Sequence, residues 1–159
     1  MARHTFFSFH YERDVWRAGQ VRNSWVTQDR VAAGFFDKAA WEEVKKKGDA
    51  AIKAWIDKQL NGTSVTVVLI GAETAARDYV KYEITQSCAK GNGLLGVYIH
   101  NLKDTSQKTD TKGTNPFSQW TFKRADGTVV SIPTYDWVND DGYNNLGTWI
   151  ETAAKAAGR

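Results

Sequence analysis

Residues 64–70 read SVTVVLI, and this nearly continuous β-branched and aliphatic run predicts a strand that is covered on both faces of a sheet. Gly71 ends the run, and a helix is predicted over residues 75–90. The next apolar run, residues 94–99 (LLGVYI), predicts a second buried strand. A buried strand, a helix and another buried strand in succession indicate parallel strands joined by a crossover helix.

The N-terminal third of the chain continues this alternation. Residues 5–9 (TFFSF) predict a short buried strand, and a helix is expected to start at Asp14, a favourable N-cap residue. Residues 34–37 (GFFD) fit either a short strand or a loop. Apolar residues at helical spacing then predict one long helix over residues 41–60, although Gly48 lies within its apolar stripe.

The C-terminal part of the chain is less regular. Residues 101–133 are polar and rich in turn-forming residues, which predicts an irregular loop and hairpin insertion. Residues 126–127 (DG) mark the turn of the hairpin. Residues 134–138 predict a last strand, and one of the aspartates at 140–141 is expected to cap a final helix.

These elements predict one α/β domain over residues 1–159, with a flavodoxin-like, doubly wound and mostly parallel five-stranded sheet. The net charge of +3 gives no reason to expect a nucleic-acid partner. No apolar run approaches the roughly 20 residues that span a bilayer. Cys88 is the single cysteine, which leaves no internal disulfide and fits a reducing compartment. We therefore expect a cytoplasmic protein without membrane or nucleic-acid partners.

Ligands of doubly wound sheets bind beyond the carboxyl ends of the strands, where the strand order reverses. In a flavodoxin-like order this crevice lies between the first and third strands, which end here at residues 8–11 (SFHY) and 70–74 (IGAET). The chain has neither a G-x-G-x-x-G fingerprint nor a Walker A loop, and the Ser/Thr/Gly-rich loop of an FMN site is also absent. The three His residues lack metal-ligand spacing, so no metal site is expected.

The helix over residues 75–90 carries the most specific pattern. Val80 and Ile84 are expected to face the sheet, whereas Tyr79 and Glu83 share another face and lie off the core stripe. From composition alone, Glu83 is a surface carboxylate with basic neighbours.

Three stretches resemble the TIR-like domains of bacterial Thoeris anti-phage defence. The matching residues are 66–71 with Thr74, Arg77, 79–80 and 82–84; residues 6–11 with Arg17, 21–23 and 25–26; and residues 135–138 with 140–144. The resemblance covers nearly the whole chain and is weakest over residues 101–133. It implies a TIR-type flavodoxin-like fold.

The resemblance also implies cleavage of the nicotinamide–ribose bond of NAD, which serves as the substrate, with no bound cofactor. Glu83 corresponds to the catalytic glutamate of the family, and Tyr79 stands in the aromatic position of its motif. Phe9 and Tyr11 are expected to stack on nicotinamide, with His10 facing the same cleft. Backbone amides near Ser8 are expected to meet the pyrophosphate. These residues form the predicted substrate site: Ser8, Phe9, His10, Tyr11 and Tyr79.

Two function classes follow from this resemblance. The first is an enzyme whose product is an ADP-ribose derivative, often cyclised, that diffuses to a partner effector and activates it. A homo-oligomer or a phage-protein trigger fits this class. The second is a TIR-like interaction module that has lost catalysis. The presence of Glu83 beside an aromatic first loop favours the enzyme.

Overall fold

The computed structural model describes residues 4–26, 32–33, 38–119 and 121–159. In these ranges five strands form one sheet in the order β2-β1-β3-β4-β5, and all neighbouring strands are parallel. The strands are β1 (Thr5–Ser8), β2 (Ala32–Ala33), β3 (Val65–Ile70), β4 (Gly93–Tyr98) and β5 (Thr134–Asp136). The predicted flavodoxin-like fold, with β3 at the centre of a parallel sheet, is confirmed.

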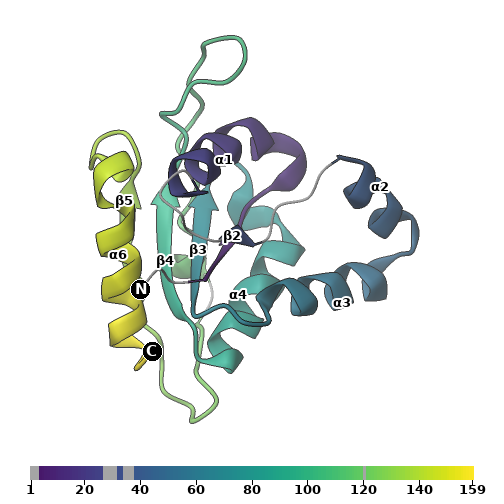
Figure 1. Cartoon of the computed structure of the whole chain (residues 1–159), viewed down its shortest axis with the longest axis vertical. Helices are drawn as coiled ribbons and strands as arrows, with labels where there is room; N and C mark the ends of the chain where they lie inside the picture. The colour runs from purple at the N-terminus through teal and green to yellow at the C-terminus, as the bar shows by residue number, and fades with distance from the viewer. Residues whose placement is uncertain (1–3, 27–31, 34–37, 120) are drawn as a thin grey trace.

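Helices cover both faces of the sheet (Figure 1). They are α1 (Tyr11–Val26), α2 (Lys38–Lys46), α3 (Asp49–Leu60), the 3-10 helix η1 (Thr74–Ala76), α4 (Asp78–Lys90), α5 (Pro116–Gln119) and α6 (Gly142–Ala156). Val67 and Leu69 of β3 pack with α1 and α6 on one face, whereas Val68 and Ile70 pack with α4 on the other. Helix α3 lies beside α4 and packs on Phe6. The sheet is therefore doubly wound.

Helix α1 begins earlier than the sequence indicates. The backbone N–H of Asp14 donates to the His10 carbonyl at 2.9 Å, and the N–H of Arg13 donates to Nδ1 of His10 at 3.2 Å. The His10 imidazole thus caps the helix in place of the expected Asp14. The expectation that Asp14 is the N-cap is wrong, and its side chain lies inside the first turn and is buried.

Two predicted helices are interrupted. Gly48 has φ of 94° and separates α2 from α3, so the expected single helix over 41–60 is wrong. Arg77 has extended backbone dihedrals and separates η1 from α4, which begins at Asp78 instead of residue 75. The segment 34–37, expected to be a strand or a loop, lies outside the described residues.

The insertion over residues 101–133 is irregular, as expected. Gly127 has φ of 86° at the predicted hairpin turn, and its flanks meet in one isolated antiparallel bridge, Lys123 with Val129. The short helix α5 was not predicted. No helix in the described ranges is long and apolar enough to cross a membrane. Within the same ranges, no group of three or more His, Cys, Asp and Glu side chains is placed to hold a metal ion.

Candidate functional site

The strand order reverses between β1 and β3. Strand β1 has β2 on one side and β3 on the other, so the carboxyl ends of β1 and β3 form the switch point where ligands of this architecture bind. Ser8 pairs with Val68 at this edge. The structure therefore brings residues 8–11 and 70–74 to the same end of the sheet, as predicted.

Glu83 lies inside the molecule. Its exposed fraction is only 8%, so the expectation of a carboxylate off the core stripe is wrong. Val80, Glu83, Ile84 and Ser87 follow the i, i+3, i+4, i+7 spacing of one helix face, and all four are buried between α4 and the sheet. The Ser87 hydroxyl donates to the Glu83 carbonyl at 2.7 Å and lies 2.7 Å from the Thr66 hydroxyl, which fixes α4 against β3.

Burial raises the pKa of Glu83 well above its ordinary value. The Ser8 hydroxyl and the charge of Arg77 act in the opposite direction and favour the ionised carboxylate. Ser8 is fully buried, and although its hydroxyl influences Glu83, it makes no hydrogen bond of good geometry within the described residues. The pair therefore offers a carboxyl group and a hydroxyl with unused hydrogen-bonding capacity at the end of β1.

His10 and Arg77 belong to the same electrostatic neighbourhood. Burial and then the charge of Arg77 lower the pKa of His10, while Arg77 also lowers that of Glu83. Arg77 therefore acts on the pKa of both His10 and Glu83, and the Ser8 hydroxyl acts on that of Glu83. Arg77 was not predicted as a site residue, although it immediately precedes the helix that carries Glu83.

The three predicted aromatic residues have different surroundings. Phe9 is 7% exposed and belongs to the core on the α1 and α6 face. Tyr11 is half-buried at the start of α1, with its ring centroid 6.1 Å from that of Phe9. Tyr79 is directed toward α3, where its hydroxyl donates to Asp49 Oδ1 at 2.9 Å. The structure therefore brings Tyr11 to the edge of the crevice and ties Tyr79 to a neighbouring helix.

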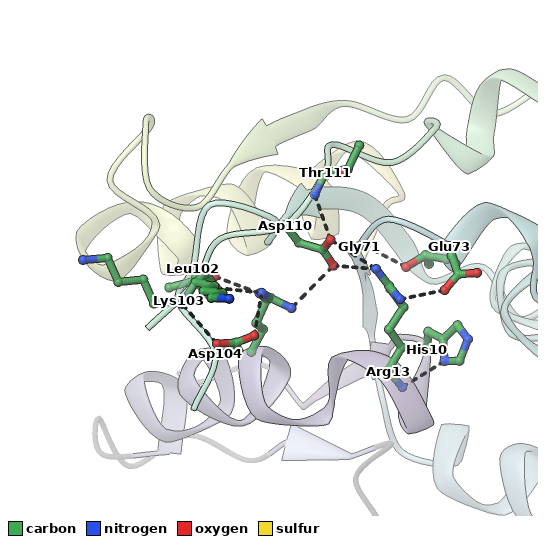
Figure 2. Close-up of polar contacts among 12 residues, drawn as sticks. His10, Arg13, Gly71, Glu73, Leu102, Lys103, Asp104, Asp110 and Thr111 are labelled. Carbon is green, nitrogen blue, oxygen red and sulfur yellow. Dashed lines mark hydrogen bonds and ion pairs between the residues drawn. The ribbon is translucent and has the colours of Figure 1, made fainter. Parts of the chain in front are cut away.

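A polar network that sequence patterns did not indicate joins α1 to the segment 102–110 (Figure 2). Arg17 is 5% exposed, and its guanidinium donates to the carbonyls of Leu102 at 2.8 Å and Lys108 at 3.0 Å. Arg13 lies between Glu73 and Asp110, 2.9 Å and 3.0 Å from their carboxylates. Its partners come from segments far apart in the sequence, so no local spacing could have found them.

Asp14 and two glycines form a close contact at the end of β3. A Cβ atom on Gly71 would lie 2.1 Å from Asp14 Oδ2, and one on Gly113 would lie 1.9 Å from the Gly71 carbonyl oxygen. The Asp14 carboxylate is 1% exposed and has no well-aligned hydrogen-bond donor within the described residues. Burial raises the pKa of Asp14 to about 6, against the opposing charges of Arg13 and Arg17. Asp14 could have been found from the sequence, because it continues the apolar stripe of α1.

Comparison with known proteins gives two matches. The family described as "Thoeris protein ThsB, TIR-like domain" matches residues 6–104, which contain β3, β4, Glu83 and all of β1 except Thr5. A protein of Bacillus cereus (strain MSX-D12), named "Putative cyclic ADP-D-ribose synthase ThsB1", is 37% identical over 191 aligned positions. That alignment covers 94% of this chain and 100% of the relative.

Proposed function

The chain belongs to the family of TIR-like domains of the Thoeris protein ThsB. We propose, from this membership, that it cleaves NAD and closes the ADP-ribose product into a ring. The observation that carries this proposal is Glu83, a buried carboxyl group at the switch point beside the Ser8 hydroxyl and within the field of Arg77. The name of the Bacillus cereus relative supports the cyclic product.

A single carboxylate is sufficient for this reaction. Nicotinamide is a pyridinium in NAD and leaves as a neutral molecule, so its departure requires no proton donor, unlike the alkoxide released by O-glycosidases. The ribose carbon that loses nicotinamide acquires oxocarbenium character. Ionised Glu83 stabilises that positive charge and orients the ribose through its hydroxyls, and exclusion of water strengthens both interactions.

Cyclisation completes the reaction. A nucleophilic atom elsewhere in the same ADP-ribosyl group attacks the oxocarbenium carbon, forms the new bond and releases one proton. The buried position of Glu83 favours this intramolecular capture over attack by water, because it keeps bulk solvent from the reacting carbon.

The ionisation of Glu83 belongs to the same proposal. Its pKa is raised by burial, and the cationic nicotinamide ring favours the ionised form when NAD binds. In the free protein the Arg77 charge and the Ser8 hydroxyl act in that direction.

The signalling role follows from the product. We propose that the cyclic nucleotide diffuses to a partner effector and activates it, and that the enzyme works in the cytoplasm during phage infection, with a phage protein as the trigger. Self-association would supply a second level of control. Neither a nucleic acid nor a membrane takes part.

Glu83→Gln tests the catalytic assignment. The substitution keeps the size of the side chain and removes its charge, so NAD cleavage should fall by a factor on the order of 10² or more. The measurement is release of nicotinamide and of cyclic product, identified by mass spectrometry, with protein from infected and uninfected cells. A folded Glu83→Gln protein that cleaves NAD at the wild-type rate would contradict the proposal.

Two further variants separate catalysis from stability. Asp78→Asn removes an exposed carboxylate from the same helix and should leave the rate unchanged. Ile84→Asn places a polar group at a fully buried position and should destabilise the fold by about 3 kcal/mol or more. If neither wild-type protein nor Asp78→Asn consumes NAD under any condition, the chain is instead a TIR-like interaction module.

A further inference from the structure

Asp110 occupies a site made by two arginines. Its carboxylate oxygens lie 3.1 Å and 3.0 Å from Nη2 of Arg13, and Oδ2 also lies 3.6 Å from Nη1 of Arg17. Two guanidinium groups that converge on one small anion form the arrangement that proteins use to bind phosphate. Here the anion is a side chain of the protein itself.

This arginine pair lies at the switch point. Arg13 contacts Glu73 in the segment that follows β3, and it belongs to the first turn of α1, directly after β1 (Figure 2). The segment that carries Asp110 also reaches the end of β3, because Gly113 lies against the Gly71 carbonyl. Asp110 therefore fills an anion site on the edge of the sheet where a ligand of this fold binds.

We propose that Arg13 and Arg17 bind the pyrophosphate of the dinucleotide, and that Asp110 occupies their site until the substrate displaces it. This inference rests on the proposed function, since it names the part of NAD that the arginines recognise. The free protein is thus held in a self-occupied state, and the segment 109–113, here called the strap, covers the end of β3 until it is displaced.

The contacts divide the loop into two parts: residues 102–108, here called the base, which stay in place, and the strap, which can be displaced. Arg17 is almost completely buried and holds the base through the carbonyls of Leu102 and Lys108. The strap is held through the side chain of Asp110 by Arg13, which is 38% exposed at its side chain. The strap is also held by the Asp110 N–H, which donates to the His100 carbonyl at 2.8 Å, and by Lys112, whose Nζ lies 4.6 Å from the centre of the Tyr98 ring. Displacement of Asp110 therefore exchanges one anionic partner of Arg13 for another and leaves the base in place.

Asp110 and Asp14 are like charges held near the same two arginines in the closed state. The charge of Asp110 raises the pKa of Asp14, against the opposing charges of Arg13 and Arg17. When the strap leaves, the incoming pyrophosphate takes the place of the Asp110 carboxylate beside the two arginines. The apparent affinity for the ligand is reduced by the fraction of molecules in which Asp110 occupies the site.

Binding of ADP to the full-length protein, measured by isothermal titration calorimetry, tests the proposal without requiring any reaction. Asp110→Asn should tighten ADP binding by about threefold or more, because the competing anion is removed. Arg13→Gln should weaken it by about tenfold or more, because a charged hydrogen-bond partner is lost. Adenosine, which lacks phosphate, should bind all three proteins equally.

Asp104→Asn is the matched control. Asp104 accepts hydrogen bonds from the backbone of Ser106 and Lys108 and lies 3.7 Å from the Arg17 guanidinium, so its loss loosens the loop and removes an anion from Arg17 without vacating Arg13. If Asp104→Asn and Asp110→Asn increase the affinity for ADP equally, the proposed role of Asp110 is overturned. It is also overturned if Asp110→Asn binds ADP with wild-type affinity or does not bind it.

The activity measurement separates this inference from the proposed function. With NAD, Asp110→Asn should lower KM and leave kcat nearly unchanged. If NAD is cleaved but KM does not fall, the inference about Asp110 fails alone. If ADP binds as expected but no variant cleaves NAD, the proposed catalytic function fails and the anion site stands.

Discussion

At the scale of single residues, the fold removes two acidic side chains from water. Glu83 is 8% exposed and Asp14 is 1% exposed, and burial raises the pKa of both carboxyl groups. An acid whose pKa is higher in the folded than in the unfolded state binds its proton more tightly when folded. The contribution of each of these two acids to stability is therefore fully present below the ordinary pKa and is lost as pH rises toward the raised one.

Asp14→Asn makes this dependence measurable. As pH rises from 3.8 to about 6, the wild-type protein should lose about 2 kcal/mol of unfolding free energy relative to the variant, after allowance for partial solvent screening. Glu83 is present in both proteins, so its contribution cancels when their unfolding free energies are subtracted. The measurement is chemical denaturation of both proteins at pH 3.5 and pH 7.5. A difference that stays constant across this range would show that Asp14 titrates normally.

The two residues also show what a residue pattern can predict. Glu83 was found as a candidate through the family motif, but its burial was missed because a carboxylate was assumed to face water. Its i+3 spacing from Val80 places it on the core face. Aspartate is a common helix cap, which is why the sequence predicts that role for Asp14, whereas in the structure the His10 side chain caps the helix.

At the scale of elements, Gly48 determines how α2 and α3 are joined. In a continuous helix, Gly48→Ala would stabilise the protein by roughly 1 kcal/mol. The observed φ of 94° with ψ of −174° is a conformation that residues with a Cβ atom avoid, so the same change should destabilise the protein by about 1–3 kcal/mol. A higher denaturation midpoint for Gly48→Ala would indicate a continuous helix, and a lower one would indicate the observed break. Gly19→Ala is the control within helix α1, because a Cβ atom added at Gly19 would meet none of the surrounding atoms within 4 Å.

The buried strands β1, β3 and β4 were predictable, whereas β2 at Ala32–Ala33 was not predicted and the helix boundaries were not predictable. Buried runs such as residues 65–70 and 93–98 have few alternatives, because both faces must be apolar. The breaks at Gly48 and Arg77 depend on how each helix reaches the sheet, which helical spacing does not record. The same holds for the network around Arg13, whose contact with Asp110 joins residues 97 positions apart.

At the scale of the whole molecule, we expect catalysis to depend on self-association. The family resemblance implies this, since TIR-type enzymes often complete their sites with a neighbouring subunit. The rate of NAD cleavage should therefore rise faster than in direct proportion to protein concentration, so that turnover per protein molecule increases. Initial rates measured from nanomolar to micromolar protein test this, with light scattering on the same samples. Strictly linear rates down to nanomolar protein would indicate a self-sufficient monomer.

The strand order also dictates the sequence in which the sheet can be completed. Strand β1 pairs with β3, so Thr5 cannot pair until Val65 has been synthesised. Strand β3 also pairs with β4, which is closer to it in the sequence. During synthesis the apolar side chains of Phe6 and Phe7 therefore emerge long before the strand that covers them. We therefore expect the β3–α4–β4 unit, which closes the shorter loop, to form before the N-terminal strand pairs with it. In a growing chain, the first segment synthesised would then be among the last to join the sheet.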